Sequence, residues 1–529
     1  MIARRYVIRS FSSLIKFDFW TKRQQSESLT LRLLPASYQV WLAVLPVMLV
    51  AFVIRGYCVF GWSYPSGADY GQVVLQADLL LSNDHLPETV PYFQLGKTNW
   101  VTMPGAALLY AFMADLSGSS VLDIIPISLI TALIEVAGVY LLAWRIFGRL
   151  DAAVVTAAVT AVLPLAPDMM AWAGYPNLIV LALIPFVFVA WLDYWEHPDR
   201  RRLVLLVLLL CGTMSIHHVS TLWIGLSLGL FALVFLIVQP AASFRKLLPL
   251  GIAGLVVGLP VVWRVIDLTF STRATDVLAG TGNRFDPTRI DWKTWARLAE
   301  PISIVLLVGG FVYFLRLQIV QAPAKVLLAC YVLVSLIFSF GWLLKIDFYY
   351  TRGLFFLSIP IAFGAASLVF YFRHVPLRAV MTVALVLFLG TTSMMRSREV
   401  AQYYQALTPE FVDAIDWLND YSQPDDVLVV GTFSGFHMAH LTPRPVMVGL
   451  TPDLVGNPEE LSIAQDAVSV LMGLHNMDEV IDERHVRFVL VKSAFDIPDP
   501  FRTQLAMNAN PRLELVFDNS KIQIYEVVN

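Results

Sequence analysis

The sequence predicts a polytopic α-helical membrane domain followed by a C-terminal α/β domain, and three observations predict it. The 529 residues are 57% hydrophobic and only 15% charged, with a mean hydropathy of +0.67, whereas soluble proteins carry roughly 25% charged residues. Apolar runs of about 20 residues, the length that spans a bilayer, recur up to residue 395 without the alternation of a membrane β-barrel. Beyond residue 395 the pattern changes to that of a water-soluble domain.

The segment 1–39 comes first and is expected to be cytoplasmic, because it carries seven Lys and Arg residues against Asp18 and Glu27. The first span, near 40–61, therefore leads to the outer face. Further spans are expected near 122–146, 152–168, 177–194, 202–219, 221–238, 247–267, 302–317, 326–344, 354–372 and 378–395. The transmembrane domain, 40–395, thus has about eleven helices.

Basic residues in the later loops agree with this threading. Five successive loops predicted to be cytoplasmic contain Arg145 and Arg149; Arg200, Arg201 and Arg202; Arg245 and Lys246; Arg316 and Lys325; and Arg373 and Arg378. The segment 99–116 is short and interrupted by Pro104 and Gly105, so we interpret it as an interfacial or re-entrant helix in the first outer loop, 62–121. An odd number of spans then places the C-terminal domain outside the cell.

The C-terminal domain, 396–529, shows helix and strand patterns in alternation. The stretch "EFVDAIDWLNDYSQPDDVLVVGTFSGF" predicts an amphipathic helix, a turn and a buried strand. The segments "RFVLVK", "LELVFD" and "KIQIYEVV" predict further strands. In "GTFSG" the serine comes one position late for a nucleophile elbow, so we interpret it as a strand-to-helix turn. The domain is expected to cover a membrane site or to bind an acceptor.

An acidic stretch follows the first span. "FGWSYPSGADYGQVVLQADLLLSNDHLPETVPYFQLG" contains Asp69, Asp78, Asp84 and Glu88 and no Lys or Arg. Asp69 lies in a turn bracketed by Pro and Gly, close to the end of the span, where a carboxylate can accept a proton from a hydroxyl. With a reference pKa of about 3.9 it is a weak base, which suffices where the hydroxyl loses its proton late. The other acids are expected to belong mainly to a solvated connector.

The layout resembles that of GT-C-type membrane glycosyltransferases. An Asp just after the first span, a long outer loop with an interfacial helix, and a C-terminal outer α/β domain carry this resemblance, with "MAWAGYPNLIVLALIPF" and "DFYYTRGLFFLSIPIAFG". It implies transfer of a sugar, with inversion, from a polyprenyl-phosphate donor to a glycan, lipid or protein at the outer face of the plasma membrane. Asp69 would be the general base. Membrane lipids are expected partners, and nucleic acid is not.

We expect no cofactor. Members with an acidic doublet in the first loop differ from this chain, in which Tyr70 follows Asp69. No metal ligand is therefore assigned, and metal dependence is left open.

Cations and imidazoles at the outer face are the candidates for binding the donor phosphate. They are Arg352 in "FYYTRGLFF", His217 and His218 in "MSIHHVSTLW", and Arg273 and Arg284 in the outer loop 268–301. Arg offers a planar fork to phosphate oxygens. Other interpretations are an interfacial anchor for Arg352, a hydrogen bond between helices for the histidines, and an amphipathic surface helix for the loop.

Sugar or acceptor contacts are assigned to Tyr70, Trp172, Tyr175 and Glu88. The aromatic residues can stack on a sugar, but a membrane-interface belt explains them equally well. Arg55 and Glu135 lie within predicted spans, and a buried ion pair between the two helices would satisfy both charges.

Two other function classes remain open on the sequence alone. A transporter or flippase of a lipid-linked saccharide should show internal repeats and a site at the membrane midplane, whereas the candidates here gather at the outer face. A non-catalytic scaffold of the same fold is the other alternative.

Overall fold

The computed structural model describes residues 42–60, 62–64, 66–67, 69–83, 87, 89–98, 103–118, 125–172, 174–270, 300–344, 350–372, 374–432, 434–449, 458–492 and 500–528. Asp69 and Arg352 are described by their backbone alone. The segment 1–39 and the candidates Arg273, Arg284 and Glu88 lie outside the described residues. The chain divides into two units, Met1–Ala43 and Val44–Asn529, and every element below belongs to the second.

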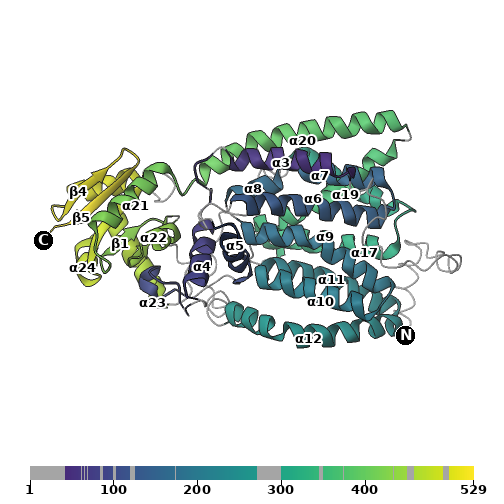
Figure 1. Cartoon of the computed structure of the whole chain (residues 1–529), viewed down its shortest axis with the longest axis horizontal. Coiled ribbons are helices and arrows are strands. Elements are labelled where there is room, and N and C mark those ends of the chain that lie inside the picture. Colours follow the sequence, from purple (N-terminus) through teal and green to yellow (C-terminus); the bar gives the residue numbers. More distant parts are fainter. Residues whose placement is uncertain are drawn as a thin grey trace. The chain divides into compact units, whose positions relative to one another are not determined.

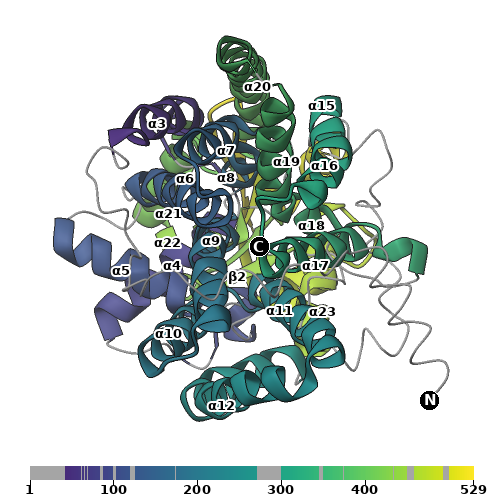
Figure 2. The same cartoon turned by 90° about the vertical axis from the view of Figure 1, so that its right-hand side faces the viewer.

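Helices that run side by side make up the membrane part (Figure 1). They are α3 (Leu45–Val59), α6 (Ile125–Phe147), α7 (Leu150–Val162), α8 (Leu165–Ala171), α9 (Tyr175–Glu196), α10 (Arg200–Ile216), α11 (His218–Val238), α12 (Pro240–Phe270), α15 (Pro301–Val305), a π-helical turn (Leu306–Gly310), α16 (Phe311–Arg316), α17 (Ala322–Ser339), a 3₁₀ turn (Gly341–Leu344), α18 (Tyr350–Phe356), α19 (Ser358–Tyr371) and α20 (Val375–Tyr403). Helix α9 occupies the middle of the bundle in the end-on view (Figure 2).

Seven helices in the described part of the chain are long and apolar enough to cross a membrane, and four apolar helices are shorter. The prediction of a helical membrane protein with a small C-terminal sheet is therefore confirmed, while the count of eleven spans stays a prediction. The expected span 152–168 is interrupted, because α7 ends at Val162 and Pro164 precedes the separate helix α8. Proline has no N–H to continue a helix.

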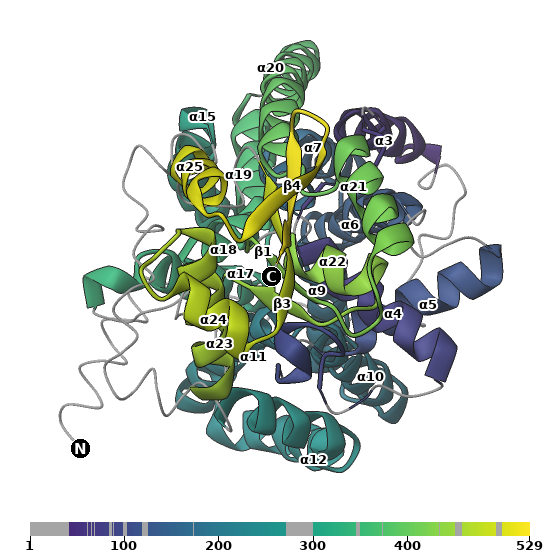
Figure 3. The ribbon, with the colours of Figure 1, turned by 90° about the vertical axis from the view of Figure 1, so that its left-hand side faces the viewer.

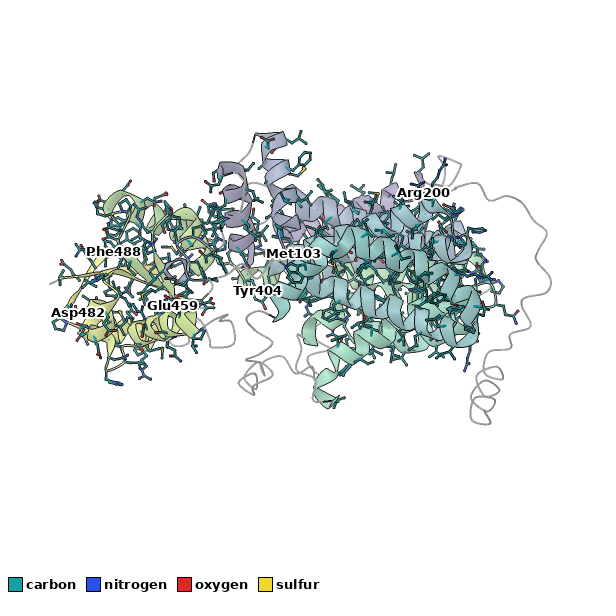
Figure 4. All side chains as sticks on the ribbon, turned by 90° about the horizontal axis from the view of Figure 1, so that it is seen from below. Met103, Arg200, Tyr404, Glu459, Asp482 and Phe488 are labelled. Atoms are coloured by element: carbon teal, nitrogen blue, oxygen red, sulfur yellow. The ribbon has the colours of Figure 1, made fainter. Side chains whose placement is uncertain are left out.

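Basic residues of three predicted cytoplasmic loops lie at one end of the bundle, here called the basic end. Arg145 at the end of α6 forms an ion pair of 2.6 Å with Asp193 at the end of α9. Arg378 at the start of α20 lies 3.6 Å from Asp151 at the start of α7. Arg200, at the start of α10, lies at this end in Figure 4. The loops after α6, α9 and α19, which the sequence places on one side of the membrane, are therefore neighbours.

A buried ion pair joins α3 to α6. Arg55 Nη1 lies 2.7 Å from Glu135 Oε2, and both side chains are completely buried. Arg55 Nη2 also donates to the carbonyl oxygen of Thr160 in α7, at 3.1 Å. The ion pair expected from the sequence is thus confirmed, and it connects three helices.

The first outer loop contains two helices and a 3₁₀ turn: α4 (Asp69–Asn83), the turn Gln94–Gly96 and α5 (Gly105–Ser117). Helix α5 forms within the segment 99–116 where a helix was expected, and its place at the membrane interface stays a prediction. Helix α4 was not predicted, because the acidic residues suggested a connector. Its apolar positions Tyr70, Val73, Val74 and Ala77 follow helical spacing and pack against α5.

The C-terminal domain is a five-stranded sheet with helices on both faces (Figure 3). Its elements are α21 (Pro409–Tyr421), β1 (Val427–Val430), α22 (Gly435–Leu441), β2 (Val446–Val448), α23 (Pro458–Leu471), α24 (Met477–Glu483), β3 (Val486–Lys492), α25 (Pro500–Ala509), β4 (Leu513–Asp518) and β5 (Ile522–Val527). The strand order is β2-β1-β3-β5-β4, with β2, β1 and β3 parallel and β5 antiparallel to both neighbours.

Alternate residues of β1 enter two separate cores. Leu428 and Val430 pack with α21 and α22, whereas Val427 and Val429 pack with α23 and α24. Burial of both faces is typical of parallel strands. The four predicted strands, the amphipathic helix and the strand-to-helix turn at "GTFSG" are confirmed.

The first outer loop is built into this domain. Phe93 pairs with Val446 as an isolated parallel bridge at the β2 edge, and its ring stacks on Phe436 with centroids 4.0 Å apart. The Gln94 side chain donates to the Val448 carbonyl oxygen (2.9 Å) and accepts from the Val448 N–H (3.0 Å). The loop therefore covers the exposed edge of β2 as an additional strand would.

Candidate functional site

Three tyrosines hold the start of α4 against the bundle. Tyr70 lies edge-on to Tyr175 at the first position of α9, with centroids 5.6 Å apart. Tyr110 of α5 lies 6.3 Å from Tyr70 and 6.2 Å from Tyr175. All three are buried. Because Asp69 is the residue before Tyr70 and the first of α4, this cluster fixes where its backbone lies.

Helices α9 and α11 begin beside each other. Pro176 at the start of α9 suits a helix N-terminus, where its missing N–H is not needed. One residue later, Asn177 Oδ1 accepts a hydrogen bond of 2.9 Å from Ser220 Oγ in the first turn of α11. The N–H of Ser220 in turn donates to His217 Nδ1, at 3.0 Å. His217 therefore caps α11, which is a structural use of its Nδ1.

Helix α18 completes a ring of helices around this end. Trp223 of α11 stacks on Phe356 of α18, with centroids 5.1 Å apart and an angle of 14° between the rings. The rings of Phe355 and Trp172 have centroids 6.2 Å apart. Trp172 directly follows α8 and lies three positions before the start of α9. The contacts thus lead from α9 to α11, α18 and α8, and back to α9.

This ring lies at the end of the bundle opposite the basic end, and we call it the domain end. The α20 helix finishes here, and the Tyr404 carbonyl oxygen accepts a hydrogen bond of 2.8 Å from Gly67, two residues before Asp69. Figure 4 shows Tyr404 and Met103 at this end and Arg200 at the other. The predicted candidates Asp69, His218 and Arg352 are all carried by helix starts at the domain end.

The remaining candidates differ in how deeply they are buried, and some lie outside the described residues. Tyr70 and Tyr175 are buried in the tyrosine cluster, while Trp172 and His218 are half-buried. The rings of His217 and His218 lie 5.7 Å apart. Glu88, Arg273 and Arg284 lie outside the described residues. Direct contact of any of these residues with a sugar or a phosphate stays a prediction.

Two features of this region were not anticipated from the sequence. Arg396 of α20 lies 3.5 Å from Asp168 of α8, and both side chains are largely buried near the domain end. The predicted span ended one residue before Arg396, so this cation was overlooked. Helix α22 brings His437 and His440 against α4, and only the tertiary fold reveals that contact.

Metal dependence stays open. The described residues contain no group of three or more His, Cys, Asp or Glu side chains close enough to hold a metal ion. Asp78, the acid of α4 whose side chain is described, is engaged elsewhere: His440 Nε2 hydrogen-bonds Asp78 Oδ2. Asp78 is therefore a helix residue in contact with the C-terminal domain, which corrects its interpretation as part of a solvated connector.

The bundle, the helical first loop and the C-terminal sheet domain together have the GT-C fold, as superposition on solved structures shows. Among solved structures, the oligosaccharyltransferase AglB from Archaeoglobus fulgidus, in complex with an inhibitory peptide and a dolichol-phosphate, superposes with a TM-score of 0.59 at 11% identity. The match covers 93% of this chain and 74% of AglB.

ArnT from Cupriavidus metallidurans is also similar. In the apo state it gives a TM-score of 0.57 at 12% identity, over 92% of this chain and 97% of ArnT. Bound to undecaprenyl phosphate it gives 0.52 at 14% identity. No protein-family model and no curated protein matches the sequence significantly. The chain therefore has the GT-C fold and is a membrane protein.

Proposed function

We propose that the protein is a membrane glycosyltransferase that moves a sugar from a polyprenyl-phosphate donor to an acceptor glycan, lipid or protein. One observation supports it most: the helix starts that carry Asp69, His218 and Arg352 gather at the domain end. The similar fold of AglB and ArnT, solved with dolichol-phosphate and undecaprenyl phosphate, supports the class of donor. By the positive-inside rule the domain end faces outward.

In the proposed reaction Asp69 is the general base. An acceptor hydroxyl oxygen attacks the anomeric carbon of the donor sugar from the face opposite the phosphate. The bond between this carbon and the phosphate oxygen breaks, its electron pair leaves with the phosphate, and the configuration inverts. The Asp69 carboxylate takes the hydroxyl proton. A carboxylate is a weak base, so the proton transfers late, once bond formation has made the hydroxyl acidic.

The leaving phosphate gains negative charge and needs a fixed cation. Arg352 is assigned this role because α18 begins at Tyr350, within the ring of helices. His218 and, through its other ring nitrogen, His217 are assigned to the same phosphate, together with Arg273 and Arg284. Trp172, Tyr70, Tyr175 and Glu88 are assigned to the sugar or the acceptor.

The deciding experiment measures transfer of radiolabelled sugars from undecaprenyl phosphate to a lipid extract of the native membrane. Purified wild type and Asp69→Asn protein are compared. Asn keeps the size of Asp and cannot accept the proton, so turnover should fall roughly 10²-fold or more. Binding of undecaprenyl phosphate should be unchanged.

The other acids of the first loop provide matched controls. Asp78→Asn, Asp84→Asn and Glu88→Gln should each reduce turnover far less than Asp69→Asn. Wild-type turnover in Asp69→Asn, together with its loss in one of these three variants, would show that the base is a different carboxylate.

A further inference from the structure

Helix α22 of the C-terminal domain packs between Phe93 of the first outer loop and the start of α4 in the same loop. On one side its Phe436 stacks on Phe93 of the loop. On the other side its backbone lies so close to α4 that a Cβ added at Gly71 would lie 2.8 Å from the backbone nitrogen of His437. Only glycine fits at position 71 without moving α22 away from α4.

His437 reaches from α22 to the residues that precede Asp69. Its Nε2 lies 3.3 Å from the carbonyl oxygen of Gly67, so this nitrogen carries the proton and donates it. The N–H of Gly67 is held from the other direction by the Tyr404 carbonyl oxygen, at 2.8 Å. The peptide groups on both sides of Gly67 are thus fixed two residues before Asp69.

The buried position of His437 costs folding stability, so stability does not explain why a histidine is here. The side chain is completely buried, and its Nδ1 has no hydrogen-bond partner among the described residues. An unsatisfied buried polar atom costs about 1–3 kcal/mol, and an apolar side chain would avoid that cost. Burial lowers the pKa of His437 to about 3, against the opposing effect of the Gly67 hydrogen bond, so the imidazole is neutral at physiological pH. A neutral imidazole is a fixed, uncharged donor.

We propose that His437 is a positioning residue, through which the C-terminal domain holds the first turn of α4 and with it the Asp69 carboxylate. The inference rests on the proposed function, because it assigns Asp69 to the reaction. His437 itself touches neither donor nor acceptor. Its contribution is to hold the Gly67 carbonyl in place, two residues before Asp69.

The test compares His437→Leu, which removes the donor, with His437→Gln, whose amide can donate to the same carbonyl. In the transfer assay with undecaprenyl-phosphate sugars, His437→Leu should lower kcat roughly 10-fold or more with KM for the donor within about twofold, since a small misplacement of a catalytic group has large effects. His437→Gln should recover most of the rate. The pH profile should keep its shape, because the imidazole does not titrate between pH 5 and 9.

His440→Leu is the matched control, because His440 joins the same helix to α4 one turn later, at Asp78. It should change kcat by less than threefold. Equal losses in His437→Leu and His440→Leu would mean that docking of α22 in general matters, and would overturn the role of this hydrogen bond.

A double-mutant comparison separates this inference from the proposed function. In the Asp69→Asn background, His437→Leu should cause no further loss, because its effect passes through Asp69. An additive loss would overturn the inference and leave the proposed function intact. Full activity of Asp69→Asn alone would instead reject the proposed function.

Hydrogen exchange tests the contact without activity. In His437→Leu the amides of residues 66–75 should exchange at least 10-fold faster, with α6 and α9 unchanged. Gly71→Ala, which keeps the imidazole but pushes α22 and His437 away from α4, should produce the same pattern if His437→Leu does not fold. Unchanged exchange in 66–75, or faster exchange throughout the protein, would overturn the proposal.

Discussion

Asp69, His218 and Arg352 each lie in the first turn of a helix: α4, α11 and α18. The backbone N–H groups at a helix start need hydrogen-bond acceptors, and neighbouring polar side chains supply them. First-turn N–H groups have no partner within their own helix, and here His217 satisfies one of them by accepting from Ser220. Side chains that do not serve as caps are therefore the ones left to bind a ligand. Among Asp69, His218 and Arg352, it is Arg352 that carries a permanent positive charge.

Replacement of Arg352 separates charge from geometry. Arg352→Ala should weaken binding of undecaprenyl phosphate and lower turnover, because the leaving phosphate loses its cation. Arg352→Lys should be less severe, since the charge survives while the planar fork is lost. Affinity can be measured by titration with undecaprenyl phosphate, and turnover by the transfer assay.

Arg398 is a suitable control for this prediction. It lies in the same outer part of the molecule, in α20, and its Nη1 donates to the Tyr57 hydroxyl at 3.0 Å. Arg398→Ala should leave donor affinity unchanged. If Arg352→Ala also leaves affinity and turnover at wild-type values, Arg352 is only an interfacial anchor.

At the scale of the elements, the ion pair between Arg55 and Glu135 ties α3 to α6 and, through Thr160, to α7. Two charges in a completely buried site stabilise a structure only together, because removal of one leaves the other without compensation. The two partners also differ chemically. A carboxylate left alone can take up a proton, whereas guanidinium cannot lose one.

This difference gives an ordered prediction for stability. Glu135→Gln should destabilise by about 3–5 kcal/mol, because it leaves the Arg55 guanidinium buried without its partner, and Arg55→Met should destabilise by less. The double variant Arg55→Met/Glu135→Met should recover part of the loss. Thermal unfolding in detergent, followed by tryptophan fluorescence, measures the three variants.

The partly exposed pair at the basic end serves as the comparison. Glu196→Gln removes a partner of Arg145 that is 24% exposed, and such pairs contribute at most about 1 kcal/mol. An equal effect of Glu196→Gln and Glu135→Gln would contradict the account of the buried pair.

Some elements could be predicted from the sequence because their signal is local. Strands β1, β3, β4 and β5 and helix α21 have the right periodicity, and the Arg55–Glu135 pair follows from the cost of a charge in lipid. Helix α4 has a helical pattern too, but its acids suggested a connector. The short strand β2 was missed, because three residues carry no periodicity and its pairing with β1 and Phe93 depends on distant parts of the chain.

The candidate site, too, could be predicted only in part from the sequence. The positions Asp69, His218 and Arg352 stand out through residue type and place along the chain. Their arrangement does not, because it depends on ring contacts such as Trp223 with Phe356. The role of His437 was not predictable at all, since in the sequence it is one histidine in a short soluble helix, and its contact with Gly67 spans 370 residues.

At the scale of the whole molecule, the orientation of the chain determines on which side of the membrane the reaction occurs. The positive-inside rule places the basic end in the cytoplasm and the C-terminal domain outside. A reporter enzyme that is active only outside the cytoplasm should be active when fused after Asn529. A reporter active only in the cytoplasm should be silent at the same position, and the opposite result would move Asp69 to the cytoplasmic side.

The pairing of the first outer loop with β2 also sets the timing of biogenesis. Gln94 and its partner Val448 are 354 residues apart, and ribosomes add about 5–20 residues per second. The loop therefore waits roughly 18–70 seconds for its partner after its own synthesis. During that interval Val90 and Phe93, both buried in the finished protein, are newly made apolar side chains without their β2 neighbours. A nascent chain that stops before β2 should therefore keep these apolar side chains exposed, which favours aggregation and chaperone binding.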